Sequence, residues 1–236
     1  MKILAIESSG SAASAAILED ESIIIEKKGP FKITHSETLM PLINECFKES
    51  GLEPSDMDLI AVSGGPGSFT GLRIGSATAK GLGFALGKDL VHVPTLDAMA
   101  MNCAGSGRIA VPMMDARRGQ VYTGIYDLED GSPRAVLEGC AMDAGELLDM
   151  INTKYPSGKV IFLGDGADAF KELIIERCKA DYIFAEGDDA YQRASSVGLL
   201  GYRKAVNGGT VSAADEAPVY LRPSQAERVR AEQNGN

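Results

Sequence analysis

The sequence predicts an α/β protein of two lobes, each with a mixed five-stranded sheet and flanking helices. Hydrophobic periodicity gives the same order of elements twice, β-β-β-α-β-α-β-α, although the two halves share a pattern and not residues. A chain of 236 residues with 44% hydrophobic residues is also long enough to bury two small cores. We expect the lobes to comprise residues 1–104 and 105–236, with a C-terminal helix and tail in the second.

The first lobe begins with three short β-rich segments, at residues 2–7, 14–18 and 22–27. Serine and glycine separate the first two, and the acidic turn at residues 19–21 separates the last two. These short connections favour antiparallel hairpins.

A helix is expected at residues 36–50. Thr34 and Glu37 have the spacing of a capping box, and Gly51 ends the segment. The apolar positions at helical spacing are Leu39, Leu42, Ile43, Cys46 and Phe47. Pro41 costs the helix an N–H donor, so we expect it in the first turn or at a kink.

A buried strand at residues 59–63 leads into a glycine-rich run at 64–71 and a helix at 70–86. A strand at 91–93 and a helix after Pro94 complete the lobe. The glycine-rich run is not a P-loop, because no Gly-Lys-Ser/Thr follows it. It either cradles a phosphate at the helix N-terminus, or forms a tight turn in which Ser68 or Thr70 caps the helix.

The second lobe repeats the order. Its expected strands are at residues 108–114, 120–126, 134–138, 160–163 and 182–185, and its helices at 144–151, 167–178 and 191–206. Two such units make up the duplicated RNase H-like, actin-like (ASKHA) fold of actin, sugar kinases and Hsp70. The tail from Asn207 is polar except for residues 218–223.

Composition excludes several functions. The formal net charge of −10 would repel a nucleic-acid backbone, so direct binding by this chain alone is disfavoured. The four cysteines lack the spacing of a zinc site or a disulfide scaffold, and we expect reduced core thiols. No run of residues reaches the length of a membrane span, and the first apolar run is too short for a signal peptide. We therefore expect a cytoplasmic protein that does not bind membranes.

Few residues could carry chemistry. ATP-using proteins of this fold open with an acidic residue and a glycine turn, a place held here by Glu7, Ser8 and Ser9. Vestigial nucleotide or phosphate contacts are therefore assigned to Glu7, Ser8, Ser9, Ser68, Thr70 and Arg73. The alternative is an ordinary hairpin with polar turn residues. Asp115, Arg117 and Arg118 form another polar cluster, at a turn that could also simply be solvated.

The helix at residues 70–86 is apolar nearly all round, since its only charges are Arg73 and Lys80. One side carries small residues at every fourth position, and the other carries Ile74, Ala77 and Phe84. One side must pack on the chain's own sheet. The other packs on a second subunit or on the helix at 36–50, and the pattern does not say which side faces outward.

Several motifs resemble a known family. They are Ile3-Leu-Ala-Ile-Glu7-Ser-Ser, His35-Ser-Glu-Thr-Leu-Met-Pro41, Gly65-Pro-Gly-Ser-Phe-Thr-Gly-Leu-Arg73-Ile-Gly75, Asp115-Ala-Arg-Arg118 with Val121-Tyr122, and Pro218-Val-Tyr-Leu-Arg222. This chain resembles the bacterial TsaB family, also called YeaZ, over essentially its whole length and most densely in residues 1–125.

The resemblance implies a non-catalytic scaffold or dimerisation subunit. It would bind and activate the catalytic homologue TsaD, help to recruit the ATPase TsaE, and form a homodimer when alone. That complex transfers threonylcarbamoyl from threonylcarbamoyl-adenylate to N6 of adenosine 37 in tRNA, which this chain would meet only through the complex. The resemblance assigns the partner contact to the helices at 36–50 and 70–86. The candidate interface residues are Leu39, Ile43, Phe47, Gly71, Leu72, Gly75, Ser76, Ala79 and Gly83.

The resemblance also implies that this chain has no catalytic residue, metal or cofactor of its own, with ATP and a metal in the partner subunits. Thr95 and Met99 stand where the catalytic homologue has two metal-binding histidines, and Gly164-Asp165-Gly166 is a reduced adenosine loop. Glu7 replaces a more frequent aspartate. The alternatives are an autonomous ATP-dependent phosphotransferase or glycopeptidase-like metalloenzyme, and a self-contained homodimeric ligand-binding module.

Overall fold

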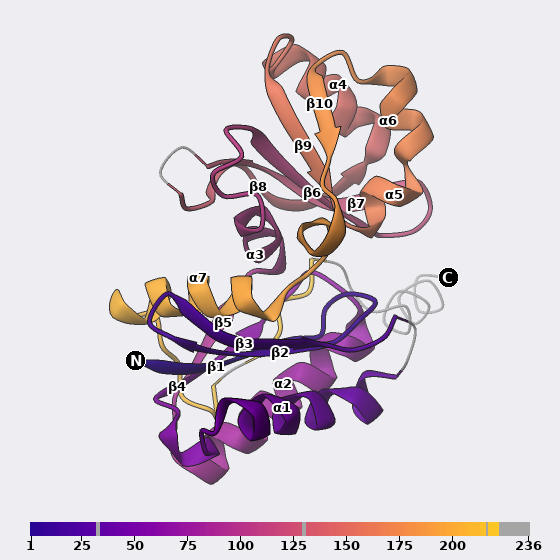
Figure 1. Ribbon diagram of the computed structural model, residues 1–236. Coiled ribbons are helices and arrows are strands. Elements are labelled where there is room, and N and C mark those ends of the chain that lie inside the picture. Colours follow the sequence, from indigo (N-terminus) through magenta and orange to yellow (C-terminus); the bar gives the residue numbers. More distant parts are fainter. Residues whose placement is uncertain (32–33, 129–130, 216, 222–236) are drawn as a thin grey trace, which may run out of the picture.

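The computed structural model describes residues 1–31, 34–128, 131–215 and 217–221, arranged as two lobes (Figure 1). The first sheet has the strand order β3-β2-β1-β4-β5 and the second β10-β9-β6-β7-β8. The strands of the first sheet are β1 Lys2–Glu7, β2 Ser14–Glu19, β3 Ser22–Lys28, β4 Leu59–Ser63 and β5 Leu90–Val93. Those of the second are β6 Ile109–Asp115, β7 Gln120–Asp127, β8 Arg134–Asp143, β9 Lys159–Leu163 and β10 Asp181–Phe184.

Both sheets are mixed, as predicted. In each, three strands joined by short turns pair antiparallel, and the strands reached through helices pair parallel. The central strand β1 is a continuous apolar run, and its residues Ile3 to Ile6 are fully buried. Such a run requires cover on both faces of the sheet.

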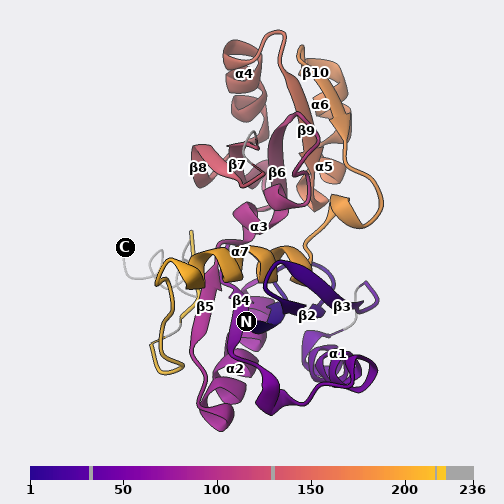
Figure 2. The same cartoon turned by 60° about the vertical axis from the view of Figure 1, so that its left-hand side comes forward.

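Helices α1, His35–Ser50, and α2, Phe69–Leu86, lie side by side on one face of the first sheet (Figures 1 and 2). Thr34 is the N-cap of α1, but the predicted capping box does not form, because its backbone carbonyl and not its hydroxyl accepts the Glu37 N–H, at 3.0 Å. Pro41 lies in the second turn and not the first, and its ring is exposed.

The second sheet is covered by α4, Ala144–Lys154, α5, Asp165–Ala169, and α6, Lys171–Arg177, while α3, Thr95–Met101, packs against its other face. The single helix expected at 167–178 is thus two helices. Phe170 divides them, since its φ of −109° and ψ of 18° leave the helical region. No described helix has the length and apolarity needed to cross a membrane.

The last helix, α7, Ala194–Val206, packs against the first sheet and not the second (Figure 2). Gly201 lets it approach closely, since a Cβ there would lie 2.6 Å from the Ala61 Cβ. The described part of the tail follows it: Val211 pairs with Leu90 at the sheet edge. The expected second lobe of residues 105–236 is therefore too long at its C-terminal end. Helix α7 and the described residues up to 221 belong to the first lobe, because the apolar side of α7 covers the second face of the sheet at β1.

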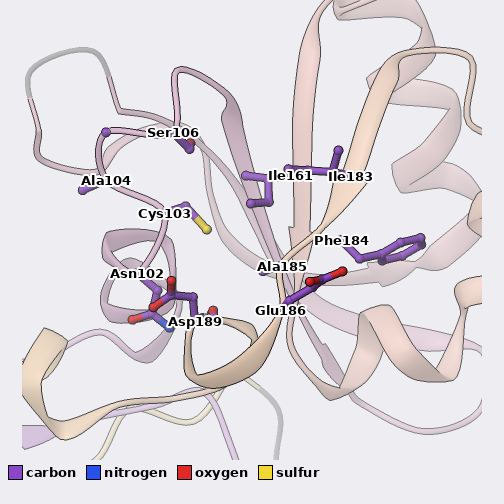
Figure 3. Close-up of a pocket in the computed structure, with 11 residues that line it drawn as sticks. Asn102, Cys103, Ala104, Ser106, Ile161, Ile183, Phe184, Ala185, Glu186 and Asp189 are labelled. Carbon is purple, nitrogen blue, oxygen red and sulfur yellow. Dashed lines mark hydrogen bonds between the residues drawn. The ribbon is translucent and has the colours of Figure 1, made fainter.

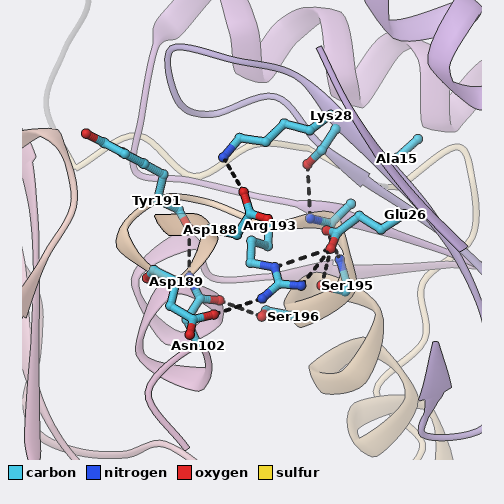
Figure 4. A network of polar contacts seen from close by, with 12 residues as sticks. Ala15, Glu26, Lys28, Asn102, Asp188, Asp189, Tyr191, Arg193, Ser195 and Ser196 are labelled. Carbon is cyan, nitrogen blue, oxygen red and sulfur yellow. Dashed lines mark hydrogen bonds and ion pairs between the residues drawn. The ribbon is translucent and has the colours of Figure 1, made fainter. Parts of the chain in front are cut away.

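The start of α7 is fixed by a polar network centred on Glu26 of β3 (Figure 4). The Glu26 carboxylate accepts hydrogen bonds from the Arg193 guanidinium at 2.9 and 3.2 Å and from the Ser195 N–H and hydroxyl at 2.9 Å. Arg193 also pairs with Asp189 at 2.8 Å. The network holds Arg193 in an extended conformation, so the helix begins three residues later than predicted.

We expect Glu26→Ala to lower the free energy of unfolding by about 2–3 kcal/mol, because it leaves a half-buried guanidinium and the α7 N-terminus without their acceptor. Urea denaturation measures the loss. Glu21→Ala is the matched control, because its ion pair with Arg203 is about half exposed at the carboxylate and should contribute at most about 1 kcal/mol. Equal losses for the two variants would contradict the structural role given to Glu26.

Candidate functional site

A cleft of about 420 Å³ lies between the two lobes. The first lobe contributes the β1–β2 turn and the loop before α2, and the second lobe contributes the β6–β7 hairpin and the start of α5. The residues that line it are Ser9, Gly10, Ser11, Gly67, Ser68, Met114, Asp115, Ala116, Arg117, Tyr122 and Asp165. The cleft thus unites the Ser9 turn, the glycine-rich run and the Asp115 cluster, which are far apart in the sequence.

Glu7 lies behind the cleft wall and is fully buried. One carboxylate oxygen accepts the Ser9 N–H at 2.5 Å, and the Ser9 and Ser63 hydroxyls also lie close enough to interact with the carboxyl. The neighbouring Ser8 hydroxyl donates to the Gly71 carbonyl at 2.9 Å and so ties the turn to α2. Burial raises the pKa of Glu7 above its ordinary value of 4.5.

Because the pKa of Glu7 is raised in the folded chain, the unfolded chain loses this proton first as the pH increases above 4.5. The folded state then binds more protons than the unfolded state, so its stability falls with rising pH through this window. We expect Glu7→Gln to be more stable than the wild type at neutral pH and to lose this advantage in acid. Urea denaturation at several pH values measures it, and an advantage that is independent of pH would contradict the prediction.

The glycine-rich run makes a tight turn whose cap is Ser68. Its hydroxyl accepts the Gly71 N–H at 3.2 Å, and its own N–H donates to the Ser9 carbonyl at 2.8 Å. Gly67 packs closely on the same turn, because a Cβ there would lie 2.6 Å from the Ser9 oxygen. The Ser9 turn therefore occupies the approach to the helix N-terminus that a phosphate would use, which favours the turn-and-cap interpretation.

Ser9 and Ser68 are the two residues of the predicted nucleotide set that line the cleft. Glu7 and Ser8 lie beneath it. Thr70 and Arg73 are exposed, and the Arg73 guanidinium lies over the Phe69 ring, 4.0 Å from its centroid, beside Tyr220 of the tail. Tyr220 belongs to the tail motif, of which Arg222 lies outside the described residues. The set therefore does not converge on one ligand.

The β6–β7 hairpin carries the cluster of Asp115, Arg117 and Arg118. Both arginines have positive φ, 65° and 57°, a conformation that L-residues rarely adopt. Arg117 reaches back to Asp115 at 3.2 Å, while Arg118 is exposed and does not line the cleft. Asp165, at the start of α5, lies close enough to Asp115 for its charge to matter. Its pKa is raised by burial and by that charge.

The nine residues predicted to contact a partner are all buried within the chain. Leu39, Ile43 and Phe47 pack in the first core. The small residues of α2 face the chain's own sheet: a Cβ on Gly75 would overlap the Ser8 hydroxyl, and one on Gly83 would lie 2.5 Å from Leu90. The side chains of the predicted contact set thus lie inside the chain, because the small stripe brings α2 close to the chain's own sheet. Their assignment to a partner contact stays a prediction.

The side of α2 that reaches the surface is the opposite one. We call it the α2 outer face, and it comprises Ile74, Ala77, Thr78, Gly81, Phe84 and Ala85, each exposed or half-buried. Phe84 is 65% exposed, and Met40 of the neighbouring α1 is 48% exposed. Its six members are uncharged, and the two charged residues of the helix, Arg73 and Lys80, lie along one edge of it, with Lys80 one turn before Phe84.

The two positions that correspond to metal-binding histidines of the catalytic homologue lie in the core. Thr95 and Met99 are both fully buried, and the Thr95 hydroxyl accepts the Gly65 N–H at 3.2 Å. Across the described residues, no group of three or more His, Cys, Asp or Glu side chains could hold a metal ion.

A larger cavity, of about 610 Å³, lies beside the end of α3 (Figure 3). Cys103 lines it, but burial raises the pKa of this thiol to about 12, so it is not a nucleophile at neutral pH. Asn102, also on the wall, donates to the Asp189 and Tyr191 carbonyls at 3.1 and 2.7 Å.

The four cysteines are free, as predicted, but they are not all in the core. Cys46 and Cys103 are buried, whereas Cys140 and Cys178 are half-buried, so the prediction of core thiols holds for two of the four.

Comparison with known proteins decides the family. The family model described as TsaD, tRNA N6-adenosine threonylcarbamoyltransferase, matches residues 31–228. The tRNA threonylcarbamoyladenosine biosynthesis protein TsaB of Bacillus subtilis (strain 168) is 32% identical over 230 residues, which cover 96% of each chain. The chain belongs to the TsaB family. The TsaB protein of Escherichia coli (strain K12) is 27% identical, again over 96% of each chain.

A solved structure extends the TsaB match to the fold. A Pseudomonas aeruginosa protein, described as uncharacterized with similarity to the peptidase YeaZ, superposes with a TM-score of 0.79 at 26% identity. The match covers 94% of this chain and 99% of that one. Together with the two mixed five-stranded sheets and their flanking helices, it confirms the predicted fold class and the resemblance to the TsaB (YeaZ) family.

Proposed function

We propose that this chain is a non-catalytic scaffold and dimerisation subunit for threonylcarbamoylation of N6 of adenosine 37 in tRNA. In this role it binds and activates a TsaD homologue, helps to recruit the ATPase TsaE, and forms a homodimer when alone. It acts in the cytoplasm, needs no cofactor of its own and meets tRNA through the complex, whose ATP and metal sites belong to the partner subunits. Membership of the TsaB family supports the pathway.

The observation that carries the scaffold role is the α2 outer face. It is a surface of small and apolar residues on an 18-residue helix, with Arg73 and Lys80 along one edge and a largely exposed phenylalanine near its C-terminal end. Small residues at Ala77 and Gly81 allow another helix to pack at short distance, and Phe84 supplies an aromatic anchor. The small residues of α2, such as Gly75 and Gly83, pack on the chain's own sheet. On these two helices, the α2 outer face and the adjacent exposed side of α1 are therefore the surfaces that a partner can contact.

The charge of the chain agrees with indirect contact with tRNA. A net charge of −10 opposes association with a polyanion, so the basic surface that holds tRNA is assigned to the partner subunits.

Size-exclusion chromatography with light scattering tests the proposal. The chain is run alone and mixed at equal concentration with the TsaD homologue of its organism. We expect a homodimer that exchanges into a mixed complex, and TsaE should enlarge only the mixed complex. A chain whose mass is unchanged by the homologue would contradict the scaffold role.

The enzyme alternative predicts the opposite behaviour. An autonomous phosphotransferase or glycopeptidase-like metalloenzyme would hydrolyse ATP or bind zinc tightly without partners. Measured on the purified chain, either activity would overturn the non-catalytic assignment and leave the family unchanged.

A further inference from the structure

The tail after α7 runs back along α2, in the direction opposite to the helix. Ala213 lies against the last turns of α2, where a Cβ on Gly83 would be 3.0 Å from the Ala213 Cβ. Val219 reaches the other end, where its N–H donates to the Gly64 carbonyl at 2.8 Å, just before α2 begins. The described tail therefore borders α2 from its last turns to its first residue.

The end of the described tail is docked on the glycine-rich run. A Cβ on Gly65 would overlap the Val219 carbonyl oxygen, so a glycine is needed there for the tail to come this close. The Tyr220 ring packs on Phe69, with 4.7 Å between the ring centroids, and the Arg73 Nε donates to the Tyr220 hydroxyl at 3.4 Å. The tail motif and the glycine-rich run, which are far apart in the sequence, are therefore parts of one structural unit.

Docking leaves a row of apolar side chains at the surface. Val219, Tyr220 and Leu221 are consecutive and are 52, 39 and 37% exposed. Their backbone is fixed by the contacts with Gly64 and Phe69, so they would lose little freedom on contact with another protein. An exposed apolar patch that is held in place in this way is typical of a binding surface.

The α2 outer face is too small to form a stable interface by itself. A standard interface takes about 20 residues from each partner, and this face offers six, most of them with small side chains. A partner seated on it must therefore extend over a flank of the helix. On the α1 flank the exposed residues include the charged Glu37 and Glu45 beside Met40. The tail flank instead offers the row of residues 219–221, which is the apolar continuation of the face.

We propose that residues 218–221 and the α2 outer face form one continuous surface for the TsaD homologue, with Tyr220 as a second aromatic anchor at the opposite end of the helix from Phe84. Arg73, stacked on Phe69 and bonded to Tyr220, lies between the tail and the outer face and joins the two. Tyrosine and arginine are among the residue types that most often dominate the energy of such contacts. This assignment rests on the proposed function, to which it adds the tail.

The affinity of the full chain for the TsaD homologue of its organism, measured by isothermal titration calorimetry, tests the tail contact. Val219→Arg keeps the backbone atoms that dock on Gly64 and adds a charge to the exposed row, so we expect it to raise Kd about tenfold or more. The matched control is Val206→Arg, because Val206 is 56% exposed at the end of α7, on the other face of the first sheet (Figure 1). This control should bind as the wild type does.

Two substitutions of Tyr220 test its ring as the anchor. Tyr220→Ala removes the ring and should weaken binding to a similar extent. Tyr220→Phe keeps the ring and should bind almost as the wild type does, because the hydrogen bond that it loses is long, at 3.4 Å. Thermal denaturation of each variant shows whether it is folded.

Unchanged affinity of the Val219→Arg and Tyr220→Ala chains would overturn the tail contact. If Phe84→Arg still weakens binding in that experiment, the α2 outer face remains the partner surface and the proposed function stands. Equal losses for Val219→Arg and Val206→Arg, or loss of the homodimer with unchanged affinity for the homologue, would overturn the tail contact as well. A wild-type chain that does not bind the homologue would overturn the proposed function and the tail contact together.

Discussion

A chain carrying Phe84→Arg should fold normally and fail to join the TsaD homologue. Phe84 projects from the α2 outer face and is 65% exposed, so the substitution removes no contact in the core. If the face is the partner surface, the substitution places a long charged side chain in a desolvated helix contact. Aromatic anchors of this kind account for at least about 2 kcal/mol of binding free energy, or roughly thirtyfold in Kd. Light scattering on the mixture would then report separate species at concentrations where the wild type associates.

The matched control is Ile175→Arg. Ile175 is 57% exposed on α6 of the second lobe, far from the α2 outer face, so the same change in chemistry is made on an unrelated surface. This variant should associate as the wild type does. Association of the Phe84→Arg variant with unchanged affinity would remove the outer face from the partner contact.

Gly75→Arg should prevent folding, although Gly75 lies on the same helix. A Cβ at this position overlaps the Ser8 hydroxyl, which itself donates to the Gly71 carbonyl, so even Gly75→Ala must move this hydroxyl and break its hydrogen bond. An arginine adds a charge to a buried site without a counter-ion. We expect Gly75→Ala to cost about 1–3 kcal/mol of unfolding free energy and Gly75→Arg to cost more than that. Thermal and urea denaturation measure both.

Gly81 provides the control on the same helix. A Cβ there meets nothing within 4 Å, so Gly81→Ala should stabilise the chain by up to about 1 kcal/mol through helix propensity. If Gly75→Ala lowers the free energy of unfolding and Gly81→Ala raises it, the two variants identify the inner and outer faces of α2. A Gly75→Arg chain that melts like the wild type and loses only its partner would instead restore the original interface assignment.

The order and type of the elements follow from local patterns, and the outer face of α2 does not. The short β-rich run at residues 14–18 and the helical spacing from Leu39 to Phe47 are set by neighbours in sequence, and both elements form as predicted. Periodicity divides α2 into a small side and a larger apolar side but does not say which one meets the sheet. That choice depends on Ser8, which the fold brings beneath Gly71 and Gly75. Ser8 and Gly71 are 63 residues apart in the sequence, so no local pattern contains both.

Two other features depend on tertiary structure in the same way. The apolar pattern of α7 predicts a helix, but the pattern is silent about which sheet it covers, and chain order suggested the wrong one. Gln192 carries no sequence signal, because what distinguishes it is a buried amide nitrogen without a hydrogen-bond partner among the described residues. The Asp115 cluster was found from sequence, since three charged residues at one turn are visible without the fold.

The return of α7 to the first sheet has a consequence during synthesis of the chain. One face of that sheet, with Ile3, Leu18 and Ala61, gains most of its cover from residues 194–206, with Ala98 of α3 beside them. Domains usually fold in the order in which they leave the ribosome. Here the N-terminal lobe cannot be completed until residues 194–206 have emerged, so the second lobe, from β6 to β10, is the first part able to finish folding. A nascent chain halted after residue 104 would expose an apolar sheet face to chaperones.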